Sequence, residues 1–198
     1  PGMVYAALRQ APAQGGSIKS YDDSVAKKMR GVLAVVTVDP KESAGMKNPK
    51  DKPPFPSEPA CAAIAVIAEH YWQARKALDA LRVEWDDGEG AKWLTTDTVN
   101  KTAMALLDSK DIKVKKANGD ISALDKQEKI VEASYLTPYC EQAPMEPLNG
   151  TALVTPDRVE VWHPTQHSQQ AFQIAVDETG MAPEKVIFHQ TYVGGAFG

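Results

Sequence analysis

The chain contains little cysteine and no long apolar run, and each absence excludes a class of protein. Its 198 residues include two cysteines, Cys61 and Cys140, which lack the CxxC spacing of a thiolate metal site or redox pair. Two alternatives stay open for them: a structural pair of thiols, or two small buried side chains. No apolar stretch reaches the ~20 residues that a membrane-spanning helix needs, and no signal peptide is recognisable.

A surplus of basic residues is also missing. The chain has 22 Lys and Arg against 26 Asp and Glu, which gives a net charge of -4. Because clustered Lys and Arg drive phosphate binding, we predict no nucleic-acid partner. The lysine-rich stretch at residues 110–129 is interleaved with acidic residues, which indicates a solvated loop or face. A hydrophobic content of 43% at this length is typical of a globular protein with one large or two modest cores.

The first part of the chain predicts an α+β domain that ends near residue 88. Strands are expected at residues 3–8, 17–21, 32–38, 62–68 and 82–85, and helices at residues 24–29 and 69–81. Asp22 or Asp23 would cap the first helix. The second helix has apolar residues near helical spacing: Trp72, Ala74, Ala77, Leu78 and Leu81. Two successive strand–helix–strand units would make up this domain.

The rest of the chain alternates polar connections with regular elements. Residues 39–59 are rich in Lys and Pro and predict a long loop. Residues 89–128 predict a polar bridge with one helix over residues 98–107. Further strands are expected at residues 129–135, 151–154, 158–162 and 186–191, with a helix over residues 168–179. Gly180 would end this last helix.

The end of the chain is rich in glycine: Val193-Gly194-Gly195-Ala196-Phe197-Gly198. Glycines after an apolar run allow positive φ and present bare N–H groups to an anionic or oxo-rich group. The sequence does not match the dinucleotide-binding motif G-x-G-x-x-G, because the first glycine of the motif would fall on Val193. The chain also begins at Pro1 with no initiator Met, so we expect a piece of a longer enzyme.

Four stretches together resemble the large molybdenum-binding subunit of the xanthine dehydrogenase and aldehyde oxidase family. They are residues 1–38, residues 62–88, QAPMEPLNGTALV at 142–154, and VWHPTQ at 161–166 followed by VIFHQTYVGGAFG at 186–198. The Ala-Pro-Met-Glu-Pro segment is similar to the branch with isoquinoline 1-oxidoreductase and bacterial aldehyde dehydrogenase large subunits. This resemblance implies an N-terminal fragment with an a/b hammerhead domain over residues 1–88. A bridge over residues 89–128 and the start of the first molybdopterin-binding domain over residues 129–198 would follow.

The resemblance also implies which residues meet the cofactor. Gln166 matches the family's glutamine near an oxygen ligand of the metal, where a side-chain amide donates a hydrogen bond without adding charge. The alternative is that Thr165 caps the following helix and Gln166 points to solvent. Glu146 would order the active-site wall, or serve in an ion pair or cap. The implied glycine-loop contacts are Gly194, Gly195, Phe197 and Gly198, with Ala196 where a third glycine is more usual.

The implied enzyme oxidises an aldehyde or N-heteroaromatic small molecule, with water as the oxygen source. Its cofactor would be a molybdopterin-type molybdenum cofactor in the cytosine dinucleotide form. Electrons would pass to 2Fe-2S clusters on a small partner subunit, with a cytochrome c as a further acceptor. The catalytic base and other cofactor loops belong to the remainder of the large subunit, so we assign no catalytic or metal-ligating residue here and expect this chain alone to be inactive. A periplasmic location is implied, with the cytoplasm as the alternative. The alternative function is a non-catalytic α+β binding or assembly module.

Overall fold

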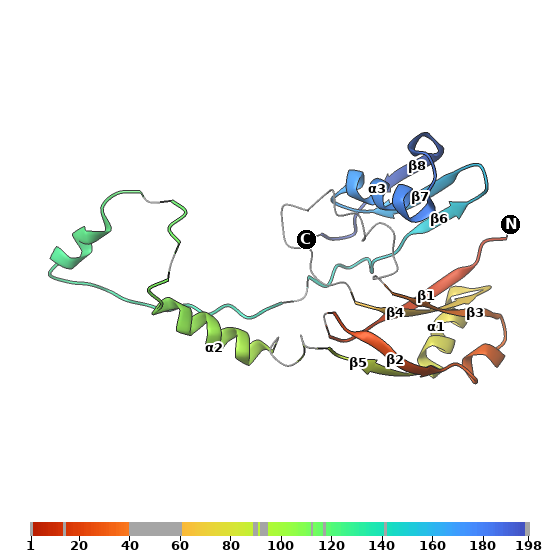
Figure 1. Cartoon of the computed structure of the whole chain (residues 1–198), viewed down its shortest axis with the longest axis horizontal. Coiled ribbons are helices and arrows are strands. Elements are labelled where there is room, and N and C mark those ends of the chain that lie inside the picture. Colours follow the sequence, from red (N-terminus) through yellow and green to blue (C-terminus); the bar gives the residue numbers. More distant parts are fainter. Residues whose placement is uncertain are drawn as a thin grey trace. The chain divides into compact units, whose positions relative to one another are not determined.

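The computed structural model describes residues 2–13, 15–39, 61–88, 91, 95–111, 113–116, 118–140 and 142–196 (Figure 1). They fall into two compact units. The first unit combines Pro1–Lys92 with Gln142–Gly198, and the second is Trp93–Glu141. The first unit contains helices and three separate sheets, so the predicted α+β class is confirmed. The loop predicted at residues 39–59 lies outside the described residues except for Asp39.

Five strands near the N-terminus form a sheet and a separate ribbon. Strands β1 (Tyr5–Gln10), β4 (Ala63–Ala68) and β3 (Val32–Val38) lie in that order and are antiparallel. Strand β2 (Ser17–Asp22) pairs antiparallel with β5 (Arg82–Asp86). The two strand–helix–strand units follow one another in the chain as predicted, but their strands pair between the units, β2 with β5 and β3 with β4. The strands interleave, because pairing in a sheet is decided by the surface that each strand buries and not by its order in the chain.

Helix α1 (Tyr71–Ala80) lies against the β1-β4-β3 sheet. Its buried residues are Ala74, Ala77 and Leu78. They join a core of aliphatic side chains: Ala7, Ala26, Ile64, Val66, Ala68 and Leu81, with Ile18, Val83 and Trp85 of the ribbon packed against it. Alanines at these positions let the helix axis approach the sheet closely. The inward placement of Trp72 is wrong: its side chain is 58% exposed and Lys76 Nζ lies 4.4 Å above its ring.

The predicted helix at residues 24–29 is shorter and tighter than expected. A single 3₁₀ turn, η1 (Ala26–Lys28), is present, and Val25 at its N-cap makes no side-chain capping bond. Asp22 Oδ1 instead accepts a hydrogen bond from Ser24 N at 2.9 Å, and Asp23 pairs with Lys27 at 2.7 Å. The aspartates thus stabilise a turn, a local alternative that their short side chains favour over a helix.

The second unit contains helix α2 (Thr96–Leu107) and the 3₁₀ helix η3 (Ile121–Lys126). A capping box between Thr95 and Thr98 starts α2, so the predicted helix at residues 98–107 is confirmed.

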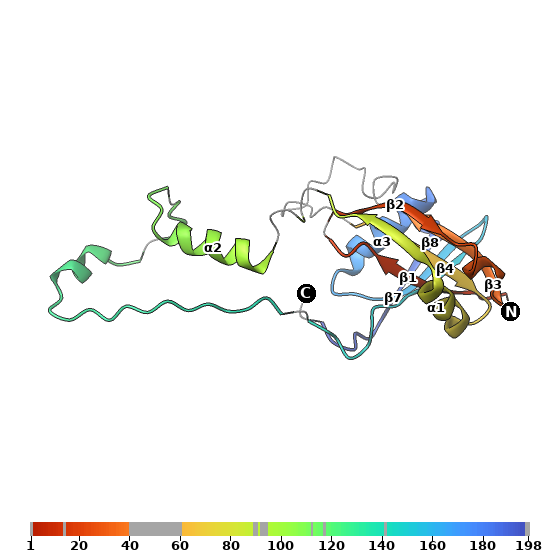
Figure 2. The same ribbon diagram turned by 90° about the horizontal axis from the view of Figure 1, so that it is seen from below.

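The strand predicted at residues 129–135 is wrong. Those residues are exposed and extended, and Figures 1 and 2 show no partner strand beside them. Among the described residues, no helix is long and apolar enough to cross a membrane.

Both alternatives for the cysteines are wrong. Cys61 and Cys140 are free thiols. Cys61, half-buried just before β4, donates to the Ala13 carbonyl at 3.3 Å, whereas Cys140 is exposed. Neither a pair nor two buried side chains is therefore present.

The third sheet lies near the C-terminal end of the described residues. Its elements are β6 (Thr151–Val154), β7 (Val159–Pro164), α3 (Ser168–Thr179), the 3₁₀ turn η4 (Pro183–Lys185) and β8 (Val186–Thr191). Strand β7 pairs antiparallel with β6 and parallel with β8, so α3 is the crossover between two parallel strands. Gly180 ends α3 with φ 64°, as expected for a left-handed cap. The elements predicted here are confirmed.

Candidate functional site

Two parallel strands end at the same edge of the third sheet. Pro164, the last residue of β7, pairs with Thr191, the last residue of β8. Gln166 follows β7 by two residues and Gly194 follows β8 by three. In α/β sheets, ligands bind beyond the carboxyl ends of parallel strands. The register therefore brings two of the predicted cofactor-binding segments to one edge, with Gln166 exposed.

The turn that carries Gln166 is held by side chains on both of its sides. Thr165 Oγ1 accepts from His167 N at 3.0 Å, and Gln190 Nε2 of β8 donates to the Thr165 carbonyl at 3.0 Å. The Ser168 hydroxyl donates to Gln190 Oε1. The N-cap of α3 is His167. Thr165 therefore closes the turn before the helix and does not occupy the capping position of the alternative interpretation.

The glycine loop contacts the segment around Glu146. Glu146 N donates to the Gly194 carbonyl at 3.2 Å. A Cβ at Gly194 would overlap the Glu146 side chain, and one at Gly195 would lie 2.8 Å from Pro144 Cβ. Gly195 also has φ 123°, whereas Gly194 is not among the glycines with positive φ. The sequence predicts a ligand at these glycines, and the described contacts show that they also make room for residues 144–146.

Asn149 connects this segment to β7. Its Nδ2 donates to Glu146 Oε1 at 2.9 Å and to the Pro147 carbonyl at 3.0 Å. The Asn149 carbonyl lies 2.9 Å from His163 Nδ1, which must be the donor because a carbonyl can only accept. His163 in turn pairs in register with Gln190. Sequence reasoning missed the roles of Asn149 and Gln190, since no motif marks an amide that orders a neighbouring segment or bonds to a distant carbonyl.

Phe197 and Gly198, which were also predicted to contact the cofactor, lie outside the described residues. Ala196 is described and half-buried. Within the described part of the chain, no group of three or more His, Cys, Asp or Glu side chains could hold a metal ion.

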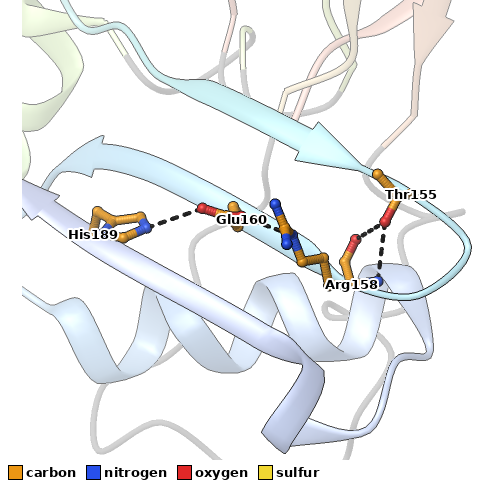
Figure 3. Close-up of polar contacts among 4 residues, drawn as sticks. All are labelled: Thr155, Arg158, Glu160 and His189. Atoms are coloured by element: carbon orange, nitrogen blue, oxygen red, sulfur yellow. Dashed lines mark hydrogen bonds and ion pairs between the residues drawn. The ribbon is translucent and has the colours of Figure 1, made fainter.

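Polar contacts connect β7, β8 and the β6–β7 turn of the third sheet (Figure 3), and an aromatic pair adds to them. Glu160 lies between Arg158 Nε at 2.8 Å and His189 Nε2 at 3.4 Å. Trp162 stacks on the His189 ring with centroids 4.9 Å apart. Thr155 exchanges hydrogen bonds with Arg158 across the β6–β7 turn. These contacts join β7 to β8 and stabilise the β6–β7 turn.

The donors at that edge suit an oxygen-rich or anionic ligand. Residues 165–168 and 192–196 contain no Lys, Arg, Asp or Glu, and the Glu146 carboxylate beside Gly194 accepts a hydrogen bond from Asn149. The Gln166 carboxamide and the main chain of the glycine loop supply neutral N–H donors. Such donors can hydrogen-bond an oxo or phosphate oxygen without adding a full charge. The residues present therefore fit the oxygen-bearing cofactor that the resemblance implied.

Comparison with known protein families gives a match over most of the chain. The model of the family described as "Molybdopterin cofactor-binding domain" matches residues 78–198. The "Membrane-bound aldehyde dehydrogenase [pyrroloquinoline-quinone]" of Gluconacetobacter polyoxogenes is 26% identical over 100% of this chain and 24% of its own length. The "Isoquinoline 1-oxidoreductase subunit beta" of Brevundimonas diminuta is 23% identical over the same shares. The chain thus spans about a quarter of the length of these relatives.

Solved structures with the same fold include two oxidoreductases. Quinoline 2-oxidoreductase from Pseudomonas putida 86 superimposes with a TM-score of 0.62 at 18% identity, over 100% of this chain and 28% of that one. The aldehyde oxidoreductase from Desulfovibrio desulfuricans ATCC 27774 superimposes with a TM-score of 0.64 at 18% identity, over 100% of this chain and 24% of that one. At this level of identity the likeness shows a shared fold.

Proposed function

The chain belongs to the molybdopterin cofactor-binding domain family, and from this premise we propose that residues 142–198 form one side of the cofactor site of a molybdenum hydroxylase. The family match confirms the resemblance drawn from the four sequence stretches. The activity belongs to a longer protein, because the chain spans about a quarter of its relatives.

One observation carries the proposal: the parallel register of β7 and β8 brings the Gln166 turn and the glycine loop to one sheet edge. When bound, the molybdenum cofactor supplies the two-electron redox chemistry of substrate hydroxylation. The chain's own part is to bind and orient that group through the Gln166 amide and the main chain of Gly194, Gly195 and Ala196. Phe197 and Gly198 follow in the sequence, and we propose that they take part as well. Because all of these donors are neutral, they can stabilise developing negative charge on an oxygen without competing for a proton.

Further features of the proposed enzyme rest on its relatives. The names of two relatives support an aldehyde or an N-heteroaromatic substrate. We extend the proposal to a cytosine dinucleotide form of the cofactor, to 2Fe-2S clusters on a small subunit, to a cytochrome c acceptor and to a periplasmic location. Residues 1–88 are proposed as a hammerhead domain and residues 89–128 as a bridge to the cofactor-binding part.

A charge substitution at Gln166 tests the proposal. In the complete protein that contains this chain, Gln166→Glu replaces an amide donor by a carboxylate that can only accept and that repels an anionic group. We expect molybdenum per protein to fall about tenfold, the loss typical of a group that supports a metal site. Gln169→Glu is the matched control, because it places the same charge on the exposed first turn of α3. Equal molybdenum contents in the two variants, measured by plasma mass spectrometry, would contradict the proposal.

The identity of the cofactor needs a second measurement, since the name of the Gluconacetobacter relative specifies pyrroloquinoline quinone. Mass spectrometry of the small molecules released from the complete protein separates the two groups. A pterin together with molybdenum supports the proposal. A bound quinone without molybdenum would overturn it.

A further inference from the structure

We propose that Gln190 is a positioning residue that sets the conformation of the turn bearing Gln166, and so aligns the Gln166 amide with the glycine loop. This inference rests on the function proposed above. Gln190 itself need not contact the cofactor. Its side chain on β8 makes two hydrogen bonds to the turn that follows β7, and these bonds would fix the turn.

Gln190 contacts residues on both sides of Gln166 in the sequence. Gln190 Nε2 donates to the carbonyl of Thr165 at 3.0 Å, and Gln190 Oε1 accepts from the hydroxyl of Ser168. The orientation of the amide is defined, because the Thr165 carbonyl can only accept a hydrogen bond. One residue before Gln166 and the second residue after it are therefore tied to the same side chain.

Gln190 lies in the exposed last part of β8. Alternation places Val186, Phe188 and Gln190 on one face of the strand, and Gln190 meets Ser168 of α3 there. Val186 is buried and Phe188 is half-buried on this face. Since an exposed position accommodates a polar side chain, the inference rests on the two hydrogen bonds of Gln190 and not on its residue type.

Gln190 also connects the turn to the second half of the site. It precedes Gly194 by four residues on the same strand and loop. Its partner in register is His163, which donates a hydrogen bond to the Asn149 carbonyl. The Asn149 side chain in turn donates to Glu146. Two adjacent side chains thus hold the two segments beside the glycine loop. Groups in a binding site must lie within about 0.5 Å of the productive geometry, and hydrogen bonds from neighbouring side chains supply this support.

The test compares Gln190→Met, which keeps the length of the side chain and removes both hydrogen bonds, with Gln170→Met on the exposed first turn of α3 as control. Both are made in the complete protein. Hydrogen exchange at the backbone amide of His167 should become about fivefold faster in Gln190→Met, the factor expected for the loss of one hydrogen bond. Molybdenum content should fall in Gln190→Met and stay at the wild-type level in Gln170→Met.

A double-mutant cycle with Gln166→Ala separates positioning from general destabilisation. If Gln190 acts through Gln166, the double variant retains as much molybdenum as Gln166→Ala alone. Losses that multiply would overturn the inference. Should Gln190→Met reduce the yield of folded protein, Ser168→Ala removes one of the two bonds from the other side and takes its place in the cycle.

The two proposals can fail separately. If Gln166→Ala loses molybdenum while Gln190→Met retains it, this inference falls and the proposed function stands. If Gln166→Ala retains full molybdenum, both fall.

Discussion

Gly194 and Gly195 are neighbours, but different physical reasons require glycine at each. At Gly194 any β-carbon would overlap the Glu146 side chain, so space is the restriction. At Gly195 the backbone has φ 123°, a conformation that residues with a β-carbon rarely adopt. A side chain at either position must move the loop or residues 144–146. The loop is thus a packed element as well as a proposed ligand contact.

Gly194→Ala should therefore impair the site. We expect residues 144–147 to shift and molybdenum content of the complete protein to fall. Gly180→Ala is the control: it lies at the far end of α3, has φ 64°, and a Cβ there meets nothing within 4 Å. That variant should lose about 1–2 kcal/mol of stability from left-handed strain and keep its molybdenum. Thermal unfolding and metal analysis of both variants check this; full molybdenum in Gly194→Ala would refute it.

Helix α1 depends on close contact between small side chains and the sheet. Leu78 is the largest buried residue that it contributes, at 1% exposure. We predict that Leu78→Ala destabilises the chain by about 2–5 kcal/mol, because it removes apolar contacts and leaves a cavity. Leu107→Ala on α2, where the side chain is 69% exposed, should change stability by less than about 0.5 kcal/mol. Urea unfolding of both variants measures the difference, and equal effects would contradict the described core.

The β2–β5 ribbon predicts a pH-dependent contribution from Glu84. Hydrogen bonds from Lys19 and Ser20, with the charge of Lys19, lower the pKa of Glu84 below its ordinary value of 4.5. A carboxylate with a lowered folded pKa stabilises the fold above its unfolded pKa and loses that effect as the pH falls through the folded pKa. The stability difference between wild type and Glu84→Gln should be present at about pH 7 and shrink toward about pH 3.

Urea unfolding at both pH values tests this expectation. Glu69→Gln, which removes one carboxylate from the same part of the chain, is the control. Since the Lys19–Glu84 pair is exposed, added salt should also reduce the difference. A difference that grows as the pH falls would show that the pair does not act in this way.

The complete site requires more protein than this chain provides. The relatives are about four times as long as the matched region, and the donors described here lie along one sheet edge. We therefore predict that residues 1–198 expressed alone contain far less than one molybdenum per chain and do not oxidise substrate. The complete protein, produced in the same cells, is the control. Stoichiometric molybdenum in the isolated chain would refute the prediction.

The accuracy of the sequence-based predictions varied with the range of the interactions involved. Helix α3 and strands β3 and β8 were predicted with their observed bounds, because apolar spacing and Gly180 are local signals. The strand at residues 129–135 was wrong, since apolar residues alone do not supply a partner. The pairing of β2 with β5 was also missed, because residues 60 to 69 positions apart had to meet.

For the proposed site, motif and resemblance were enough to identify the family and to select Gln166 and the glycine loop, because residue type and chain order carry that information. The register of β7 against β8, the packing of Glu146 on Gly194 and the bonds of Gln190 follow from the folded chain alone. Each of these is a contact between segments that are distant in sequence. Such contacts depend on which surfaces are buried together, and no local pattern of residues encodes them.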